Sequence, residues 1–292
     1  MDDSTPPSGS AAPPIPEAIE RAFVRIEEGQ VHLRRLAAAD PSAPPLLLLH
    51  ASPASSWFMQ NLMLTLRSSG VRGEIVAPDT PGNGDSCVPA VDEPDIGYFA
   101  DAMRRLCDAL GLATVDVYGT HTGARIACEL AAAFPDRVRR VVLDGITEYP
   151  DELREVVIAN YAPVVEPDAY GRHLIWAFNF CRDQALFFPH FMQQPQNRLA
   201  VPIPPPDILH RITLDVLKSL GSYSKPYIAI MDGIVMGGGV GISAHGSHRI
   251  VTENSVVARA LEILTDGRAV SLAAGDAAKA AAMAHFLSGG DA

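Results

Sequence analysis

The chain has 292 residues, of which 48% are apolar and 20% are charged, a composition typical of a soluble globular enzyme. Its formal net charge of −11 argues against nucleic acid as a partner, because phosphate binding requires clustered lysine and arginine. The four cysteines form no CxxC pair, and no 18-residue apolar run or signal-peptide pattern is present. We therefore expect a cytoplasmic protein with free thiols and no membrane span, and the oligomeric state stays open.

The first third of the chain alternates segments typical of strands and of helices. Residues 1–16 are rich in proline and serine, which predicts a disordered tail. The apolar runs Pro45–His50 and Glu74–Pro78 are typical of strands that are buried on both faces of a parallel sheet. A loop with turn-forming residues, Asp79–Ser86, follows the second run. Tyr98–Leu110 then has the apolar spacing of a helix.

The turn Gly119-Thr-His-Thr-Gly123 is the most informative stretch of the sequence. The strand-like run Ala113–Tyr118 precedes it, and the alanine-rich, helix-like run Ala124–Phe134 follows it. This order is the pattern of a nucleophile elbow, in which a strained backbone lifts one side chain above the edge of a sheet. Glycines flank the turn because a larger residue would collide with the neighbouring strand and helix. The lifted residue is His121, where serine, cysteine or aspartate is expected.

Residues 139–145 predict one further strand, and the alternation of strands with helices indicates a mostly parallel α/β sheet flanked by helices. The run Leu46–His50, the loop Asp79–Ser86 and the elbow occur in this order. On these motifs, residues 45–146 resemble the first half of an α/β-hydrolase domain. The resemblance implies an α/β-hydrolase fold with its site at the elbow.

The same resemblance continues towards the end of the chain. Residues 150–222 are similar to the helical cap of some of these hydrolases, and Arg268–Leu272 and Ala277–Leu287 are similar to their last strand and closing helix. The resemblance therefore covers residues 45–222 and 262–288. It implies four parts: a tail at 1–16, the first part of the core at 17–149, the cap at 150–222 and the C-terminal part of the core at 223–292.

A second resemblance interrupts the first. Lys225–Glu253, with its glycine-rich run Met236–Gly241, is similar to the crotonase superfamily, in particular to 3-hydroxyisobutyryl-CoA hydrolases and enoyl-CoA hydratases. It implies a backbone N–H at a helix N-terminus that holds a thioester oxyanion. The rest of a crotonase unit is absent from the sequence. Because so short a segment cannot bury its own core, we predict that Tyr227–Met231 adds a strand to the hydrolase sheet, with Asp232 at its carboxyl end.

His121 has two interpretations. It is either the remnant of an elbow that has lost its nucleophile, or a general base that activates water, a role that suits the near-neutral pKa of histidine. A base needs an acid that orients it. The resemblance places the triad histidine at Asp276, so we rank Asp276 first, Asp144 second and Asp232 third as the orienting acid. Aspartates at such positions also commonly serve as turn or cap residues.

The resemblance also implies an oxyanion hole formed by the backbone N–H groups of Ser52 and Thr122. Ala51 stands where the family normally has glycine, which adds a Cβ to that turn. His245 and His248 have no acidic or cysteine partner at ligand spacing, so we predict no metal site. We predict no cofactor either.

Three functions remain open from the sequence. The first is a hydrolase that cleaves an ester, thioester or related acyl bond of a small-molecule substrate beneath the cap. The second is a CoA-thioester enzyme of crotonase type, which rests on residues 225–253 alone. The third is a catalytically inactive hydrolase fold that acts as a binding protein. Substitution of His121 separates the first from the third, and a CoA-binding assay separates the second.

Overall fold

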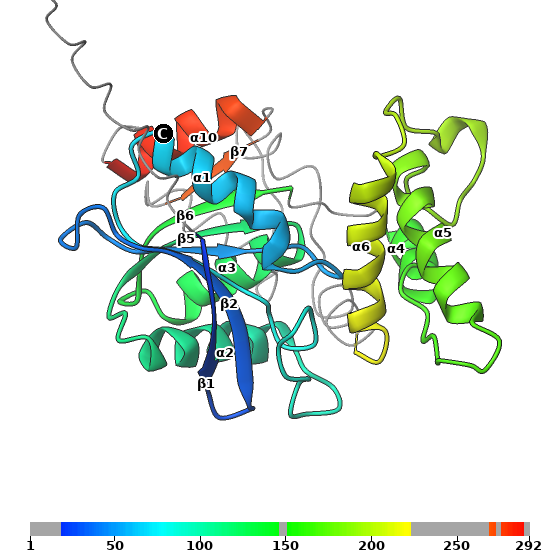
Figure 1. The fold of residues 1–292 in the computed structure, drawn as a ribbon, viewed down its shortest axis with the longest axis horizontal. Helices are drawn as coiled ribbons and strands as arrows, with labels where there is room; N and C mark the ends of the chain where they lie inside the picture. The colour runs from blue at the N-terminus through cyan, green and yellow to red at the C-terminus, as the bar shows by residue number, and fades with distance from the viewer. Residues whose placement is uncertain (1–18, 146–150, 223–268, 273–275, 289–292) are drawn as a thin grey trace, which may run out of the picture.

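A computed structural model describes residues 19–145, 151–222, 269–272 and 276–288. Its centre is a seven-stranded sheet with the order β1-β2-β4-β3-β5-β6-β7 (Figure 1). Neighbouring strands from β4 to β7 run parallel, whereas β2 pairs antiparallel with both β1 and β4. The predicted α/β class with a mostly parallel sheet is confirmed. The strands are β1 (Glu20–Arg25), β2 (Gln30–Leu36), β3 (Leu46–Leu49), β4 (Ile75–Pro78), β5 (Val115–Thr120), β6 (Val138–Asp144) and β7 (Ala269–Leu272).

Helices cover both faces of this sheet. On one face lie α2 (Ile96–Ala109) and α3 (Thr122–Ala133), and on the other lie α1 (Gln60–Ser68) and α10 (Asp276–Ser288) (Figure 1). The predicted helix at Tyr98–Leu110 begins earlier than expected, at Ile96. The reason is its N-cap: the Asp95 carboxylate accepts a hydrogen bond of 2.7 Å from the Tyr98 N–H.

Strand β3 shows why its apolar run becomes a central strand. Its four leucines are completely buried. Leu47 and Leu49 belong to the hydrophobic cluster beneath α2 and α3, and Leu46 and Leu48 to the cluster beneath α1 and α10. Successive side chains of a strand point to opposite faces. A strand between two helical layers therefore needs apolar residues at every position.

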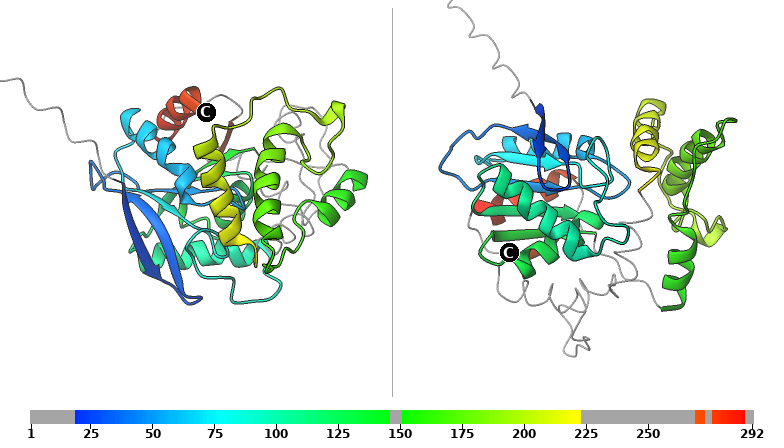
Figure 2. Two further views of the ribbon diagram at one scale, coloured as in Figure 1. Left: turned by 45° about the vertical axis from the view of Figure 1, so that its right-hand side comes forward. Right: turned by 90° about the horizontal axis from the view of Figure 1, so that it is seen from below.

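Three further helices form a separate group beside the sheet (Figures 1 and 2). They are α4 (Asp151–Asn160), α5 (Arg172–Leu186) and α6 (Pro206–Ser219), and they share a hydrophobic cluster that includes Ala177, Phe180 and Val216. We refer to α4, α5 and α6 as the cap. The two 3-10 helices η1 (Ser56–Met59) and η2 (Pro195–Asn197) complete the elements described. No helix in these parts of the chain is long and apolar enough to cross a membrane.

The crotonase-like segment, with the predicted strand Tyr227–Met231 and Asp232, lies outside the described residues, as do His245 and His248. The strand that pairs with the outer side of β6 is β7, which confirms the last strand expected from the sequence. The strand prediction for residues 227–231 and the division of the chain into four parts stay predictions.

Candidate functional site

The elbow predicted between β5 and α3 is present, with His121 at its tip. Among the described residues, His121 is the one non-glycine residue with a positive φ (φ 48°, ψ −109°). Such a backbone conformation is unfavourable for a residue with a Cβ and persists where the surrounding structure enforces it. Here the His121 N–H donates a 2.8 Å hydrogen bond to the Asp144 carbonyl, and the His121 carbonyl accepts from Ala124 N–H at 3.1 Å. The turn is therefore tied to β6 on one side and to α3 on the other.

The two glycines of the elbow allow the close approach of three backbones. A Cβ at Gly119 would lie 2.1 Å from the Gly123 carbonyl oxygen, and a Cβ at Gly123 would lie 2.2 Å from the Leu49 carbonyl oxygen. Neither space can hold another atom. Strand β3 and the first turn of α3 therefore impose the requirement for glycine that was deduced from the sequence.

The imidazole of His121 lies against the end of β6. A Cβ at Gly145 would come within 2.8 Å of Cε1 of this ring and within 3.0 Å of Nδ1. The preceding residue, Asp144, is buried and pairs with Thr120 in the sheet. Its carboxylate accepts a 2.7 Å hydrogen bond from the Tyr118 hydroxyl. The structure thus brings the Asp144 backbone to His121 and holds its carboxylate with Tyr118.

The side chains of the other two acid candidates are not described by the structure. Asp276 is the first residue of α10, but its side chain is not among those described, and Asp232 lies wholly outside the described residues. Their contact with His121 stays a prediction. Of the three candidates, Asp144 is the one whose surroundings are known.

The residues of the predicted oxyanion hole come together. The Ser52 N–H donates a hydrogen bond of 3.3 Å to Thr122 Oγ1, and Thr122 opens helix α3 directly after His121. A free N–H at a helix N-terminus favours negative charge. The turn accommodates Ala51, whose carbonyl accepts a 2.7 Å hydrogen bond from His50 Nδ1. The additional Cβ at residue 51 therefore does not prevent the loop from reaching the elbow.

A cavity of about 310 Å³ lies between this loop, the elbow and the cap. Such a volume is at the lower end of the range of about 300–1,000 Å³ that is usual for small-molecule sites. Its walls are mostly apolar, and burial raises the pKa of the Cys181 thiol in the cap wall to about 11. The lining residues are Ala51, Ser52, Pro53, Ala54, Phe58, Met59, Thr120, His121, Phe180, Cys181, Gln184, Ile212 and Val216.

A buried polar network beneath the cavity was not expected from the sequence. His50 Nε2 accepts a 3.1 Å hydrogen bond from the Thr80 N–H, while its Nδ1 bonds the Ala51 carbonyl. Both ring nitrogens are thus used by a neutral imidazole, in agreement with the effect of burial, which lowers the pKa of His50. His50 thereby positions the loop that carries Ser52.

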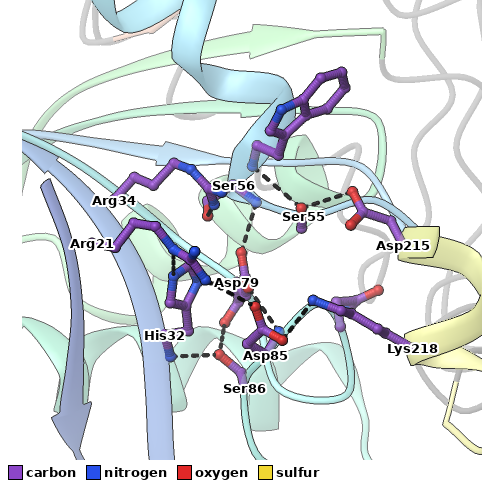
Figure 3. Close-up of polar contacts among 12 residues, drawn as sticks. Arg21, His32, Arg34, Ser55, Ser56, Asp79, Asp85, Ser86, Asp215 and Lys218 are labelled. Carbon is purple, nitrogen blue, oxygen red and sulfur yellow. Dashed lines mark hydrogen bonds and ion pairs between the residues drawn. The ribbon is translucent and has the colours of Figure 1, made fainter. Parts of the chain in front are cut away.

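Asp79 is the centre of a second set of buried polar contacts (Figure 3). Its carboxylate bonds His32 Nδ1 at 2.9 Å and accepts from the N–H groups of Ser56 at 2.7 Å and Asp85 at 2.9 Å. Burial opposes ionisation, but the hydrogen bond from His32 and the backbone donors hold the pKa of Asp79 well below its usual range. A Cβ at Gly84 would lie 2.1 Å from Asp79 Oδ2. The loop 79–86 is therefore folded around one carboxylate, which its Asp-x-Pro-Gly-x-Gly sequence could have indicated.

His32, Asp79 and Asp85 offer three potential metal-ligand atoms within 4.8 Å of one another. Each of these groups already has partners in the protein. Asp85 forms ion pairs with Lys218 at 2.6 Å and with Arg21 at 3.4 Å, and Arg21 Nε donates to His32 Nε2 at 3.1 Å. The three groups of this cluster are therefore already paired within the protein.

Known proteins resemble two separate parts of the chain. Residues 44–161 match the family "alpha/beta hydrolase fold", and residues 211–260 match "Enoyl-CoA hydratase/isomerase". The chain is 33% identical over 135 residues to 2-hydroxymuconate semialdehyde hydrolase of Pseudomonas sp., covering 46% of this chain and 42% of that protein. It is 55% identical over 40 residues to mitochondrial 3-hydroxyisobutyryl-CoA hydrolase of Xenopus tropicalis, covering 14% of this chain and 10% of that protein. The chain therefore spans less than half of the length of these curated relatives.

Solved structures share the fold at low sequence identity. Epoxide hydrolase A from Mycobacterium thermoresistibile superposes with a TM-score of 0.61 at 17% identity, over 93% of this chain and 99% of that one. A hydrolase from Pseudomonas aeruginosa gives a TM-score of 0.60 at 17% identity, over 91% and 98% of the two chains. These likenesses concern the fold alone.

Proposed function

We propose that this chain hydrolyses an ester, thioester or related acyl bond of a small molecule bound in the cavity, because residues 44–161 match the α/β-hydrolase fold family. The observation that supports this proposal is the position of His121. It occupies the strained tip of the elbow and lines the cavity together with Ser52 and Thr120. A titratable side chain held in this conformation at the wall of a cavity is typical of a catalytic group.

In the proposed reaction, His121 acts as the general base. A water oxygen attacks the carbonyl carbon while its proton moves to the imidazole, and the imidazolium then protonates the leaving group. The oxygen of the tetrahedral intermediate is held by the N–H groups of Ser52 and Thr122. The long hydrogen bond between Ser52 N–H and Thr122 Oγ1 is one that an oxyanion could replace. No acyl-enzyme forms, because the elbow tip carries no serine, cysteine or aspartate.

The orienting acid remains Asp276 or Asp144. Asp144 is supported by its place at the end of β6, where a Cβ on the following residue would meet the His121 ring. Asp276 is supported by its place at the start of α10, after the last strand. Replacing each by asparagine and comparing the losses in kcat decides between them.

The curated relatives support a carbonyl substrate. Two of them are named 2-hydroxymuconate semialdehyde hydrolase and 2-hydroxy-6-oxononadienedioate/2-hydroxy-6-oxononatrienedioate hydrolase 2, names that describe carbonyl compounds. The match of residues 211–260 to the enoyl-CoA hydratase family supports a CoA thioester as a second candidate substrate. Titration with a non-hydrolysable acyl-CoA analogue, monitored by calorimetry, tests that alternative.

The experiment that tests the main proposal compares the wild type with His121→Asn on 4-nitrophenyl esters and on acyl thioesters. Asparagine tolerates positive φ better than most residues and carries no basic nitrogen. We expect turnover to fall about 10²–10⁴-fold, the usual contribution of a general base. In the wild type, kcat/KM should rise with pH as the imidazole loses its proton, because only the neutral ring can act as the base. Equal activity of the variant, or an acyl adduct found by intact-protein mass spectrometry, would refute the mechanism.

A further inference from the structure

Three neutral polar residues line the cavity with side chains that have no hydrogen-bond partner among the described residues, namely Ser52, Thr120 and Gln184. Ser52 Oγ is buried and has no hydrogen-bond partner among the described residues. Gln184, on α5, is half-buried at the cavity wall, and its amide forms no hydrogen bond within the part of the chain that the structure describes. Burying the Ser52 hydroxyl without a partner costs free energy. Polar side chains that line a cavity without protein partners are typical of positions that contact a ligand.

Ser52 and Gln184 come from different parts of the fold. Ser52 belongs to the loop after β3, beside the elbow, whereas Gln184 belongs to the cap. Apolar residues make up most of the remaining lining, among them Phe58, Phe180 and Ile212. The cavity thus has polar residues at the elbow and at one position of the cap, and mostly apolar residues elsewhere.

We propose that Gln184 binds a neutral hydrogen-bonding group on the acyl chain, a carbonyl or hydroxyl separated from the cleaved bond by an apolar stretch. This inference rests on the function proposed above and names its substrate class. An amide both donates and accepts hydrogen bonds, so either group suits it. A carboxylate does not, because no lysine or arginine is among the described lining residues and a buried charge needs a partner. The volume of about 310 Å³ further favours a compact substrate.

A matched pair of esters tests the proposal on the full chain. The pair is 4-nitrophenyl 5-oxohexanoate and 4-nitrophenyl hexanoate, which differ in one chain carbonyl. We expect the wild type to prefer the oxo ester in kcat/KM by about 3- to 10-fold, the effect of one neutral hydrogen bond. The Gln184→Met variant keeps the volume of the side chain, and its ratio should fall to about 1. An equal ratio in the wild type, or a preference that survives in Gln184→Met, overturns the proposal.

Gln193→Met is the matched control. Gln193 lies in the cap too, in the segment between α5 and α6, but it donates to Asp183 Oδ2 at 3.0 Å and is not among the residues that line the cavity. This variant should retain the wild-type ratio even where it lowers the stability of the cap. Loss of the ratio in Gln193→Met would show that cap stability, and not a contact of Gln184, sets the preference.

A binding measurement separates this proposal from the failure of the proposed function. The ligands are 1-phenylhexane-1,5-dione and 1-phenylhexan-1-one, which mimic the two acyl chains and cannot be hydrolysed. Calorimetric titration should give a dissociation constant about 3- to 10-fold lower for the dione with the wild type, and equal constants with Gln184→Met. Selective binding without ester hydrolysis would refute the proposed hydrolase function and support the role of Gln184. Ester hydrolysis with no selectivity in either assay would support the hydrolase function and refute the role of Gln184.

Discussion

Asp215 on cap helix α6 accepts a 2.7 Å hydrogen bond from Ser55 Oγ in the core, and both residues are almost completely buried (Figure 3). Arg211 adds an ion pair to the same carboxylate at 3.2 Å and lies over the Trp57 ring at 5.2 Å. Burial nevertheless raises the pKa of Asp215. The cap is thus attached to the loop that borders the cavity by a carboxylate that depends on its partners.

Removal of the Ser55 hydroxyl should loosen this attachment. We expect Ser55→Ala to lower the free energy of unfolding by about 1.5–3 kcal/mol, the range for a hydrogen bond to a charged group. Urea denaturation measures it. Ser42→Ala is the control, because Ser42 donates a 2.7 Å hydrogen bond to Asp40 at an exposed site, where the loss should stay below about 0.5 kcal/mol. Equal losses in the two variants would contradict a role for the buried bond.

His190 should make the cap sensitive to acid. Its ring packs edge-on against Tyr161, Phe180 and Phe191, and its Nδ1 is buried without a partner. Burial lowers the pKa of His190 to about 4, an effect that nearby Asp183 only partly offsets. In the unfolded chain, His190 binds a proton at higher pH than it does in the folded protein. The stabilisation that the folded protein gains by keeping His190 neutral is therefore fully present above about pH 6.5 and is lost as the pH falls towards 4.

Thermal unfolding between pH 4 and pH 7 tests this prediction. The melting temperature of the wild type should fall with pH more steeply than that of His190→Phe, which keeps an aromatic ring but cannot be protonated. His210→Phe, at an exposed position of α6, should keep the wild-type slope. Parallel curves for the wild type and His190→Phe would show that this histidine does not contribute.

Gly145→Ala should displace the imidazole of His121. The new Cβ would lie 2.8 Å from His121 Cε1, in addition to the strain at φ 69°. Gly111→Ala has the same strain at φ 72° but no atom within 4 Å of the new Cβ. Both variants should lose about 1–2 kcal/mol of stability from the backbone, and Gly145→Ala should also lose at least tenfold in kcat/KM. Full activity of Gly145→Ala at unchanged stability would refute the assigned position of the ring.

Asp79→Asn should destabilise the core. Asparagine cannot accept all the hydrogen bonds that the carboxylate receives from His32, Ser56 and Asp85, so we expect a loss of about 3 kcal/mol. Asp95→Asn is the control, since asparagine caps a helix as well as aspartate does and should cost almost nothing. Because the folded-state pKa of Asp79 is depressed, its contribution is present above about pH 4 and is lost as the pH falls further. A chemical denaturation series from pH 3 to 7 measures both effects.

Local sequence patterns were sufficient for much of the fold. The four leucines of β3 predict a strand covered on both faces, since every position must be apolar there. The elbow was predictable because glycines at 119 and 123 are a local steric requirement of one tight turn. The boundary at Ile96 was missed because its cap, Asp95, precedes the apolar spacing by which the helix was identified. By itself, therefore, the sequence determined the α/β core and the place of His121 within it.

Only the tertiary structure decided what surrounds His121. His32 and Asp79 lie 47 residues apart, and Ser55 and Asp215 lie 160 residues apart, so no local pattern connects them. The cavity combines residues from 51 to 216, because chain folding brings the cap over the end of the sheet. The hydrogen bonds, the burial and the closeness of Gly145 to the His121 ring all depend on distances between segments that are remote in sequence. Periodicity and turn chemistry act over a few residues, whereas a site is set by which surfaces meet when the core is buried.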